Sequence, residues 1–411
     1  MECKKSDNNI KKERLWTHNF SLLFQGQLVS VFGNIIYDTA LKLWILTKTG
    51  SVSLMAVFTA ITIIPEIIVS PFAGTFIDRY DKKIILIITD TISGIGIIFV
   101  GLASILGILK IWMVVLIGSI VGLCTCFFNP SIDSIIPELV PKSKLIKANS
   151  VFSSMSTANN MIGYAFGGFL IKLLGIPIVF LFNGISFLIS AFSEYFIKIH
   201  KVEKHSEELT FLEDLRFGIR FIKNFKGLKY LYMVISFLNL CAVMSMTLTL
   251  PWFQLNKQLG IVAYGVAMGI NTLGMFVGFS FLSVINIKSD KKFMMFILSG
   301  VLISSTMIVY SFTMNRIIIY SMFFINGISL AVINSLIQIS LQNNVPSKIR
   351  GKIFAFKNTI SSALMPVGML IAGLLAEKLR INFIVSGDYI VFLIFIIYVL
   401  FLPEVKEVIN S

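Results

Sequence analysis

Twelve stretches of about 20 mostly apolar residues fill this 411-residue chain and limit its possible folds more than any other feature. The hydrocarbon core of a bilayer is roughly 30 Å thick, so each stretch is long enough to cross it as a helix. The chain has 56% hydrophobic and only 14% charged residues, and this composition excludes a soluble multi-domain protein. The sequence therefore predicts an all-α membrane protein with twelve transmembrane helices. The predicted spans are 19–46, 52–76, 84–106, 111–130, 148–172, 177–199, 228–253, 262–285, 293–312, 317–340, 354–376 and 384–402.

The lysines and arginines are distributed unevenly between the two sides of these spans. Of 35 such residues, 27 lie in the two tails and the even-numbered loops, and 8 lie in the odd-numbered loops or the spans beside them. Because Lys and Arg are retained on the cytoplasmic side, we expect both termini in the cytoplasm. The net charge of +14 is then mainly a consequence of topology, and no nucleic-acid partner is expected.

Two short motifs recur about half a chain apart. Tyr80-Asp81-Lys82-Lys83, after the second span, matches Ser289-Asp290-Lys291-Lys292, after the eighth, and Val140-Pro141 matches Val345-Pro346 in the same way. These loops are equivalent in a six-plus-six arrangement, which favours two homologous halves, as in transporters built from repeats. The predicted units are an N-terminal tail 1–18, a six-helix bundle 19–199, a linker 200–227, a second six-helix bundle 228–402 and a cytoplasmic tail 403–411.

The linker has the pattern of an amphipathic helix from Thr210 onward, with Glu213 in the capping-box position. We expect this helix to lie along the membrane surface, and a regulatory or partner-binding role is the alternative.

A distinctive loop, 74–83, joins the second and third spans. It contains Gly74, which permits close approach of helices, then Asp78 and Arg79, and it ends in two lysines. The Gly-x-x-x-Asp-Arg pattern followed by basic residues resembles the corresponding loop of the major facilitator superfamily.

Further segments resemble the drug-efflux branch of that superfamily, which includes macrolide exporters of Gram-positive bacteria. They are Phe128-Asn129-Pro130, Pro137 to Pro141, Phe211 to Gly218 and Val345 to Lys352. The resemblance covers essentially the whole chain. It implies two pseudo-symmetric six-helix bundles and the proton-driven export of a small amphipathic compound such as a macrolide.

Acidic side chains within spans are costly in a bilayer and are candidates for function. Glu66 lies near the middle of the second span, with no Lys or Arg beside it on its own helix, so it must be protonated or face a wet cavity. It is the first candidate for proton coupling or recognition of a cationic substrate. The alternatives are a protonated carboxyl bonded between helices, or exposure to lipid.

Asp38 is the second candidate, with Asn34 and Tyr37 as possible neighbours in the same cavity. Because Lys42 follows Asp38 at i+4, an internal ion pair is an equally good interpretation.

The acidic residues near the inner ends of spans three and four are expected to form a cytoplasmic gate instead. Asp90 and Asp133 would join Asp78, Arg79 and Arg350 in a charge network. Glu194 and Asp388 lie near predicted helix ends and are expected to reach the lipid headgroups.

The second half offers amide side chains for contact with a substrate, among them Asn239, Asn271 and Asn326, together with many Met and Phe residues that adapt to varied ligands. The chain has no phosphate-binding loop for ATP and no His-containing metal motif, so we expect no cofactor, no metal and no enzymatic activity.

These observations predict a bacterial plasma-membrane exporter of a hydrophobic or cationic compound. It would work as a monomer, by proton antiport and alternating access. The rival hypotheses are an importer or facilitator of a nutrient or siderophore, a non-transporting receptor or scaffold, and a lipid flippase.

Overall fold

The computed structural model describes residues 15–141, 144–198, 225–284, 287–345 and 364–410, and these residues form thirteen helices. The predicted amphipathic helix of the linker and the gate residue Arg350 lie outside the described residues. The helices are α1 His18–Thr49, α2 Val52–Arg79, α3 Lys82–Ile105, α4 Ile111–Leu139, α5 Leu145–Leu174, α6 Ile176–Tyr195, α8 Lys226–Leu255, α9 Gly260–Val284, α10 Ser289–Phe312, α11 Arg316–Asn344, α13 Met365–Lys378, α14 Ile381–Val399 and α15 Pro403–Asn410.

The first twelve of these helices overlap the twelve predicted spans, which confirms the all-α membrane fold. Ten helices in the described part are long and apolar enough to cross a membrane. Only helices satisfy all their backbone groups internally in lipid, so apolar runs of this length have little choice of structure.

Local sequence determines where the first helix begins and ends. The Thr17 hydroxyl accepts a bond from the Phe20 backbone N–H at 3.2 Å and caps the start of α1. At its other end Gly50 adopts a left-handed conformation, with φ of 64°, and its N–H donates to the Leu46 carbonyl at 2.9 Å. The chain can therefore turn directly into α2.

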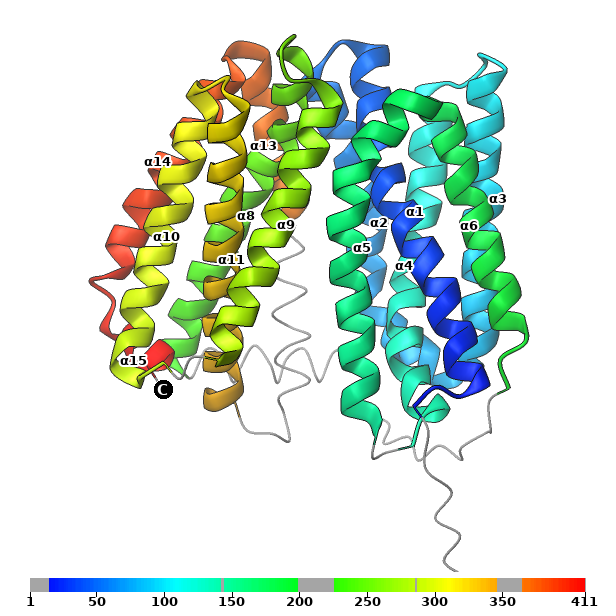
Figure 1. Ribbon diagram of the computed structural model, residues 1–411, viewed down its shortest axis with the longest axis horizontal. Helices are drawn as coiled ribbons and strands as arrows, with labels where there is room; N and C mark the ends of the chain where they lie inside the picture. Colours follow the sequence, from blue (N-terminus) through cyan, green and yellow to red (C-terminus); the bar gives the residue numbers. More distant parts are fainter. Residues whose placement is uncertain (1–14, 142–143, 199–224, 285–286, 346–363, 411) are drawn as a thin grey trace, which may run out of the picture.

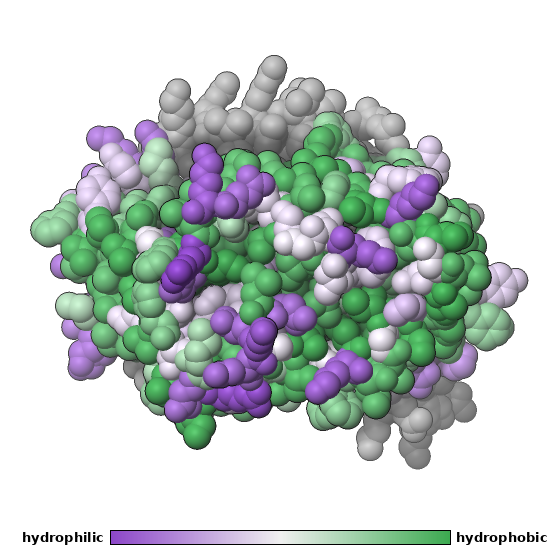
Figure 2. Space-filling view, turned by 90° about the horizontal axis from the view of Figure 1, so that it is seen from above, coloured by the Kyte–Doolittle hydropathy of each residue, from purple (hydrophilic) through white to green (hydrophobic). Residues whose placement is uncertain are grey.

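The helices form two bundles, α1 to α6 and α8 to α14, that come together at one end and diverge toward the other (Figure 1). α1 begins, and α15 lies, at the diverging end, so both ends of the described chain are on the same side. From the opposite end, the two bundles form a continuous surface with scattered hydrophilic groups (Figure 2).

Glycines allow the two bundles to approach closely at the end opposite the termini. A Cβ on Gly265 of α9 would lie 2.5 Å from the Tyr164 carbonyl oxygen of α5, and one on Gly269 would lie 2.7 Å from the Ala165 Cβ. Gly373 of α13 stands in the same relation to Ala56 of α2, at 2.8 Å. Helices in lipid associate through such close packing, so these contacts hold the bundles together.

Toward the termini, the helices that line the gap carry exposed polar side chains. Ser153, Ser154 and Ser156 of α5 and Asn334 and Gln338 of α11 are all exposed there. Side chains of this kind indicate access to water rather than to lipid. The bundles therefore pack closely at the end opposite the termini and diverge at the end that carries them.

The C-terminal segment, predicted as a tail, is the short helix α15 packed on the second bundle. Val405, Val408 and Ile409 form its buried stripe, and the Asn410 side chain accepts from the Phe293 N–H at 2.9 Å. Sequence reasoning missed it because eight residues give no apolar run.

Each bundle joins its first and last helices through a polar pair in the interior. The Asn183 amide of α6 donates to the Asn34 side chain of α1 at 3.3 Å. In the second bundle, the Ser245 hydroxyl of α8 donates to the Asp388 carboxylate of α14 at 2.7 Å. Asn183 and Asp388 both lie seven residues after the start of their helices, as expected for two related halves.

The expectation that Glu194 and Asp388 reach the headgroups is wrong. Glu194 has 0% exposed surface and Asp388 has 8%. α14 begins at Ile381, three residues before the predicted span, which places Asp388 two turns inside the helix, facing α8. Glu194 does lie in the last turn of α6, but it points toward the bundle interior.

Replacing Gly265 by alanine tests the contact between α5 and α9. Because the backbones must move apart, we expect a lower apparent Tm in detergent, equivalent to a loss of about 1–3 kcal/mol. Differential scanning fluorimetry would measure it. Gly387→Ala is the matched control, since nothing lies within 4 Å of its Cβ position. Equal Tm values for the two variants would contradict the close packing.

Replacing Ser245 by alanine tests the polar pair of the second bundle. The Asp388 carboxylate loses its hydroxyl donor, and we expect a loss of about 1–3 kcal/mol, seen as a lower apparent Tm. Ser305→Ala serves as the control, because that exposed hydroxyl bonds only the Val301 carbonyl of its own helix. A Tm for Ser245→Ala that matches the control would show that the pair contributes nothing.

Candidate functional site

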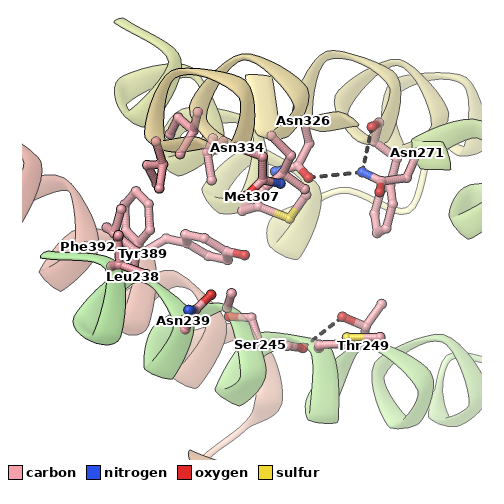
Figure 3. A pocket seen from close by; sticks show the side chains of 18 of the residues that line it. Leu238, Asn239, Ser245, Thr249, Asn271, Met307, Asn326, Asn334, Tyr389 and Phe392 are labelled. Atoms are coloured by element: carbon pink, nitrogen blue, oxygen red, sulfur yellow. Dashed lines mark hydrogen bonds between the residues drawn. The ribbon is translucent and has the colours of Figure 1, made fainter. Parts of the chain in front are cut away.

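A cavity of about 690 Å³ lies within the second bundle (Figure 3). α8, α9, α10, α11, α13 and α14 all contribute to its wall. Most of the lining is apolar, and four methionines and three phenylalanines supply adaptable surface. They are Met246, Met268, Met307, Met365, Phe279, Phe323 and Phe392. The size and the predominantly apolar lining are typical of a binding site for a small molecule.

Amides and hydroxyls are set into this apolar wall. The Asn271 amide donates to the Asn326 side chain and to the Phe323 carbonyl, both at 3.0 Å. The Thr249 hydroxyl donates to the Ser245 carbonyl at 2.8 Å, within the same helix. Figure 3 shows the hydrogen bonds of Asn271 and Thr249 at the cavity wall, with Asn239 extending from α8 on one side.

No Asp, Glu, Lys or Arg is among the described residues that line this cavity. Asp388 is close behind the wall, where it bonds Ser245, but the cavity surface itself is uncharged. The site can therefore offer hydrogen bonds and apolar contact to a ligand, but no direct ion pair from its own wall.

The three amides singled out from the sequence, Asn239, Asn271 and Asn326, all line this one cavity. Sequence reasoning gave no reason to add Ser245 and Asp388. An acidic residue in an apolar span was the available signal, but its position near the predicted helix end suggested the lipid surface instead.

Glu66, the first coupling candidate, lies on α2 and is half-buried. It faces α4, where its carboxylate would lie 4.0 Å from a Cβ on Gly122 and is within electrostatic range of Cys126. Glu66 does not line the large cavity. It also does not line a polar cavity of about 60 Å³ in the first bundle, which is described below. It forms no ion pair with a described Lys or Arg.

Asp38 forms the ion pair that the spacing allowed, with Lys42 Nζ at 2.6 Å. Tyr164 of α5 and Tyr264 of α9 lie within electrostatic range of Asp38, so the pair sits close to the contact between the bundles.

Asn34 and Tyr37, predicted to share a cavity with Asp38, face other surroundings. Tyr37 is buried and packs edge-on against Phe180, with ring centroids 5.3 Å apart. Asn34 bonds Asn183 and lines the smaller cavity. The structure therefore does not gather these three side chains around one ligand.

The predicted gate is described only in part. The side chains of Gly74, Asp78 and Arg79 lie outside the described residues, as Arg350 does, so their network stays a prediction. Asp133 is exposed near the C-terminal end of α4.

Asp90, the remaining member of the predicted gate, is buried between α3 and α6. Its neighbours there are Ser190 and Glu194 of α6.

An ion pair between Lys82 and Glu138 joins the start of α3 to the end of α4. It lies on the side of the protein that carries the chain termini, where the gate was expected. The Lys82 ammonium also donates to the Ser134 carbonyl at 3.1 Å. Both partners belong to sequence segments that carry the family resemblance, but nothing in the sequence indicated that they pair.

A small polar cavity of about 60 Å³ lies in the first bundle. Side chains of α1, α3, α4 and α6 form its wall, and Gln27, Asp90 and Asn129 are among them. It is too small for a drug-sized molecule but has room for water.

Similar proteins match nearly the whole length of this chain. Macrolide efflux protein A of Streptococcus pyogenes is 22% identical over 400 residues, covering 93% of this chain and 96% of that protein. Among solved structures, the nucleoside transporter NupG aligns with a TM-score of 0.70 at 13% identity, covering 92% of this chain and 99% of its own.

A bacterial homologue of the iron transporter ferroportin, in its inward-facing state, aligns with a TM-score of 0.69 at 16% identity. It covers 92% of this chain and 98% of its own. At such identities these two likenesses show the fold alone.

The profile of the Major Facilitator Superfamily matches residues 23–369. Together with the two six-helix bundles, this match shows that the chain is a multi-pass transport protein, not an enzyme, and that it belongs to the major facilitator superfamily.

Proposed function

We propose that this protein exports a small amphipathic compound across the bacterial plasma membrane in exchange for protons. The uncharged, mostly apolar cavity with amides on its wall is the observation that carries the proposal. It supports binding of a ligand with a large apolar surface and several hydrogen-bonding groups, because both kinds of partner are present.

The named relative narrows the class of compound. Macrolide efflux protein A is named for macrolides, which are large rings with much hydrocarbon and many hydroxyl and carbonyl oxygens. Amide donors such as those of Asn239 and Asn334 would suit such oxygens, and the Met and Phe side chains would suit the ring. We therefore propose a macrolide-like substrate, recognised without an ion pair from the cavity wall.

Alternating access would carry the compound across. In the described conformation the bundles pack closely at the end opposite the termini and diverge at the end with the termini. If the excess of Lys and Arg places the termini in the cytoplasm, this is the state that takes up substrate from the cell interior. Separation of α5 from α9 and of α2 from α13 would then release it outside. A single chain contains the whole path, so a monomer is sufficient.

A proton gradient is the proposed energy source. The first bundle has four acidic groups within its spans, Asp38, Glu66, Asp90 and Glu194, and the cavity wall in the second bundle has none. Asp38 is neutralised by Lys42, which makes it the weaker of the two candidates chosen from the sequence. Glu66 has no ion-pair partner among the described Lys and Arg residues, but it lines neither of the two cavities described above.

Transport in proteoliposomes tests this proposal. With an acidic lumen, protons leave as substrate enters, so radiolabelled erythromycin should accumulate severalfold above the level in protein-free liposomes. The comparison with protein-free liposomes is essential, because a weak base enters acidic vesicles without a transporter. Nigericin, which collapses the pH gradient, should abolish the difference.

Each rival function predicts a different result in the same vesicles. Equal flux with and without the gradient would indicate a facilitator or importer. Absence of flux would favour a receptor or scaffold. Movement of a headgroup-labelled lipid in place of erythromycin would identify a flippase.

Replacing Asn239 and Asn334 together by leucine tests the role of the cavity. Each lost hydrogen bond costs about 1 kcal/mol, so we expect erythromycin binding to weaken about tenfold or more. Ser321→Ala on α11 is the control, because that exposed hydroxyl bonds only the Ile317 carbonyl of its own helix. Unchanged affinity in the double variant, measured by scintillation proximity, would place the substrate elsewhere.

A further inference from the structure

Two buried carboxyl groups face each other where α3 packs against α6. Asp90 of α3 has 1% exposed surface, and Glu194 of α6 has 0%. Glycines bring the two helices close together, since a Cβ on Gly94 would lie 2.9 Å from the Gly184 carbonyl oxygen. Their places in the sequence predicted a gate for Asp90 and the lipid surface for Glu194, so the two were not expected to meet.

One serine connects the two acids. The Ser190 hydroxyl donates to Glu194 Oε1 at 3.4 Å, and it also lies within hydrogen-bonding reach of Asp90. A hydroxyl has one proton and can serve only one carboxyl group at a time. Asp90 Oδ2 and Glu194 Oε2 have no hydrogen-bond partner among the described residues. The cluster is therefore short of donors.

Among the described side chains, the neighbouring helices bring polar groups to this cluster but no cation. Gln27 of α1 has 5% exposed surface, and its Nε2 has no partner in the described part of the chain. It lines the 60 Å³ cavity together with Asp90. From α4 the Cys124 thiol lies within electrostatic range of Asp90, with its own bond to Ser93.

The lysines in the first turn of α3 are engaged elsewhere. Lys82 pairs with Glu138 of α4, and Lys83 lies over the Tyr195 ring at 5.5 Å from its centroid. The two ion pairs of the described residues, Lys42 with Asp38 and Lys82 with Glu138, leave this cluster without one. α2 and α5 also pack in this bundle. The acidic side chain that α2 carries within its span, Glu66, faces Cys126 of α4 rather than the pair of Asp90 and Glu194.

Two ionised carboxylates cannot be buried side by side without a compensating cation, because desolvation and mutual repulsion both oppose it. A proton bound to one acid removes one charge and supplies the missing donor between the two. We propose that Asp90 and Glu194, bridged by Ser190, form a dyad that holds the transported proton.

The proton would reach this dyad through the small cavity. Asn129 lines the cavity and is exposed on α4, so polar groups lead from the open side of the protein to Asp90. The cavity has room for water, and Gln27 can hold a water molecule beside the carboxyl group. Closure of the terminal side would then isolate the loaded dyad until the other side opens. This inference rests on the proposed proton-coupled export and assigns its coupling site to residues other than Glu66.

Infrared difference spectroscopy on the reconstituted full-length protein tests the dyad without any substrate. We expect the carbonyl stretch of a protonated carboxyl group to change with pH in the wild type. The change should be lost in Asp90→Asn/Glu194→Gln, whose side chains mimic the protonated acids. It should persist in Glu66→Gln and in Asp290→Asn, a matched exposed acid on α10. Because neutral isosteres relieve repulsion, the double variant should fold with an unchanged or higher apparent Tm.

Transport of erythromycin by the single variants Asp90→Asn and Glu194→Gln supplies the second measurement. We expect gradient-driven accumulation to fall about tenfold or more while exchange of labelled for unlabelled erythromycin, without a gradient, is retained. Glu66→Gln and Asp290→Asn should keep both activities.

The outcomes separate this inference from the function on which it rests. If the wild type shows no gradient-driven flux, proton-coupled export fails, and the infrared signal alone decides whether the dyad binds protons. If the wild type is coupled but the double variant keeps its infrared signal, or if Glu66→Gln alone loses coupling, the dyad assignment is overturned. If sodium ions abolish the wild-type signal at constant pH, the ligand is an alkali cation and the proton assignment is overturned.

Discussion

Close contact between glycine-containing helices at the end opposite the termini holds the two bundles in their observed arrangement, on which the other features of the structure depend. Helices in lipid gain little from the hydrophobic effect on one another, so their association depends on packing and on internal hydrogen bonds. Gly265 and Gly269 let α9 approach the backbone of α5, and Gly373 does the same for α13 against α2. The bundles are closed there and free to diverge toward the termini, where water reaches polar side chains of α5 and α11.

Within each bundle, a polar pair joins the first helix to the last, and its members on the last helices, Asn183 and Asp388, lie at equivalent positions. Asn34 and Asn183 form it in the first bundle, and Ser245 and Asp388 form it in the second. Buried polar groups in lipid have few alternative partners, so such pairs fix how the helices are rotated. The two halves therefore keep a common framework even where their sequences have diverged.

The two bundles differ in where they place charge. The second contains a large cavity whose described wall is uncharged, whereas the first buries Asp90 at the wall of a small polar cavity and Glu194 near it. This difference supports a division of roles in which substrate binds mainly to the second bundle and protons bind to the first. Coupling would then arise from the rocking of the bundles, because one conformational change exposes both sites to the same side.

The ionic contacts at the terminal end fit the same scheme. Lys82 and Glu138 hold α3 to α4 next to the loop that carries the family's Asp-Arg motif. This pair lies within one bundle and can persist through the transport cycle. The contacts between bundles at Gly265, Gly269 and Gly373 involve backbone and small side chains, which separate at lower cost than buried ion pairs do.

The sequence by itself determined the number and approximate positions of the spans, the two-fold repeat and the family. These properties follow from the length of the apolar runs, the requirement that backbone groups in lipid be satisfied internally, and a few loop motifs. It also identified Asn239, Asn271 and Asn326, which share a cavity, and the ion pair of Asp38 with Lys42, which is local to one helix.

Only the tertiary structure decided which way the acidic side chains point. Asp388 and Glu194 face the interior because α14 and α6 are rotated by contacts with α8 and α3, and no sequence pattern records such a rotation. α15 was missed because its stability comes from packing on the second bundle rather than from its own length. Asp90 and Glu194 belong to helices far apart in the chain, so their approach depends on how α3 and α6 pack, which local sequence does not specify.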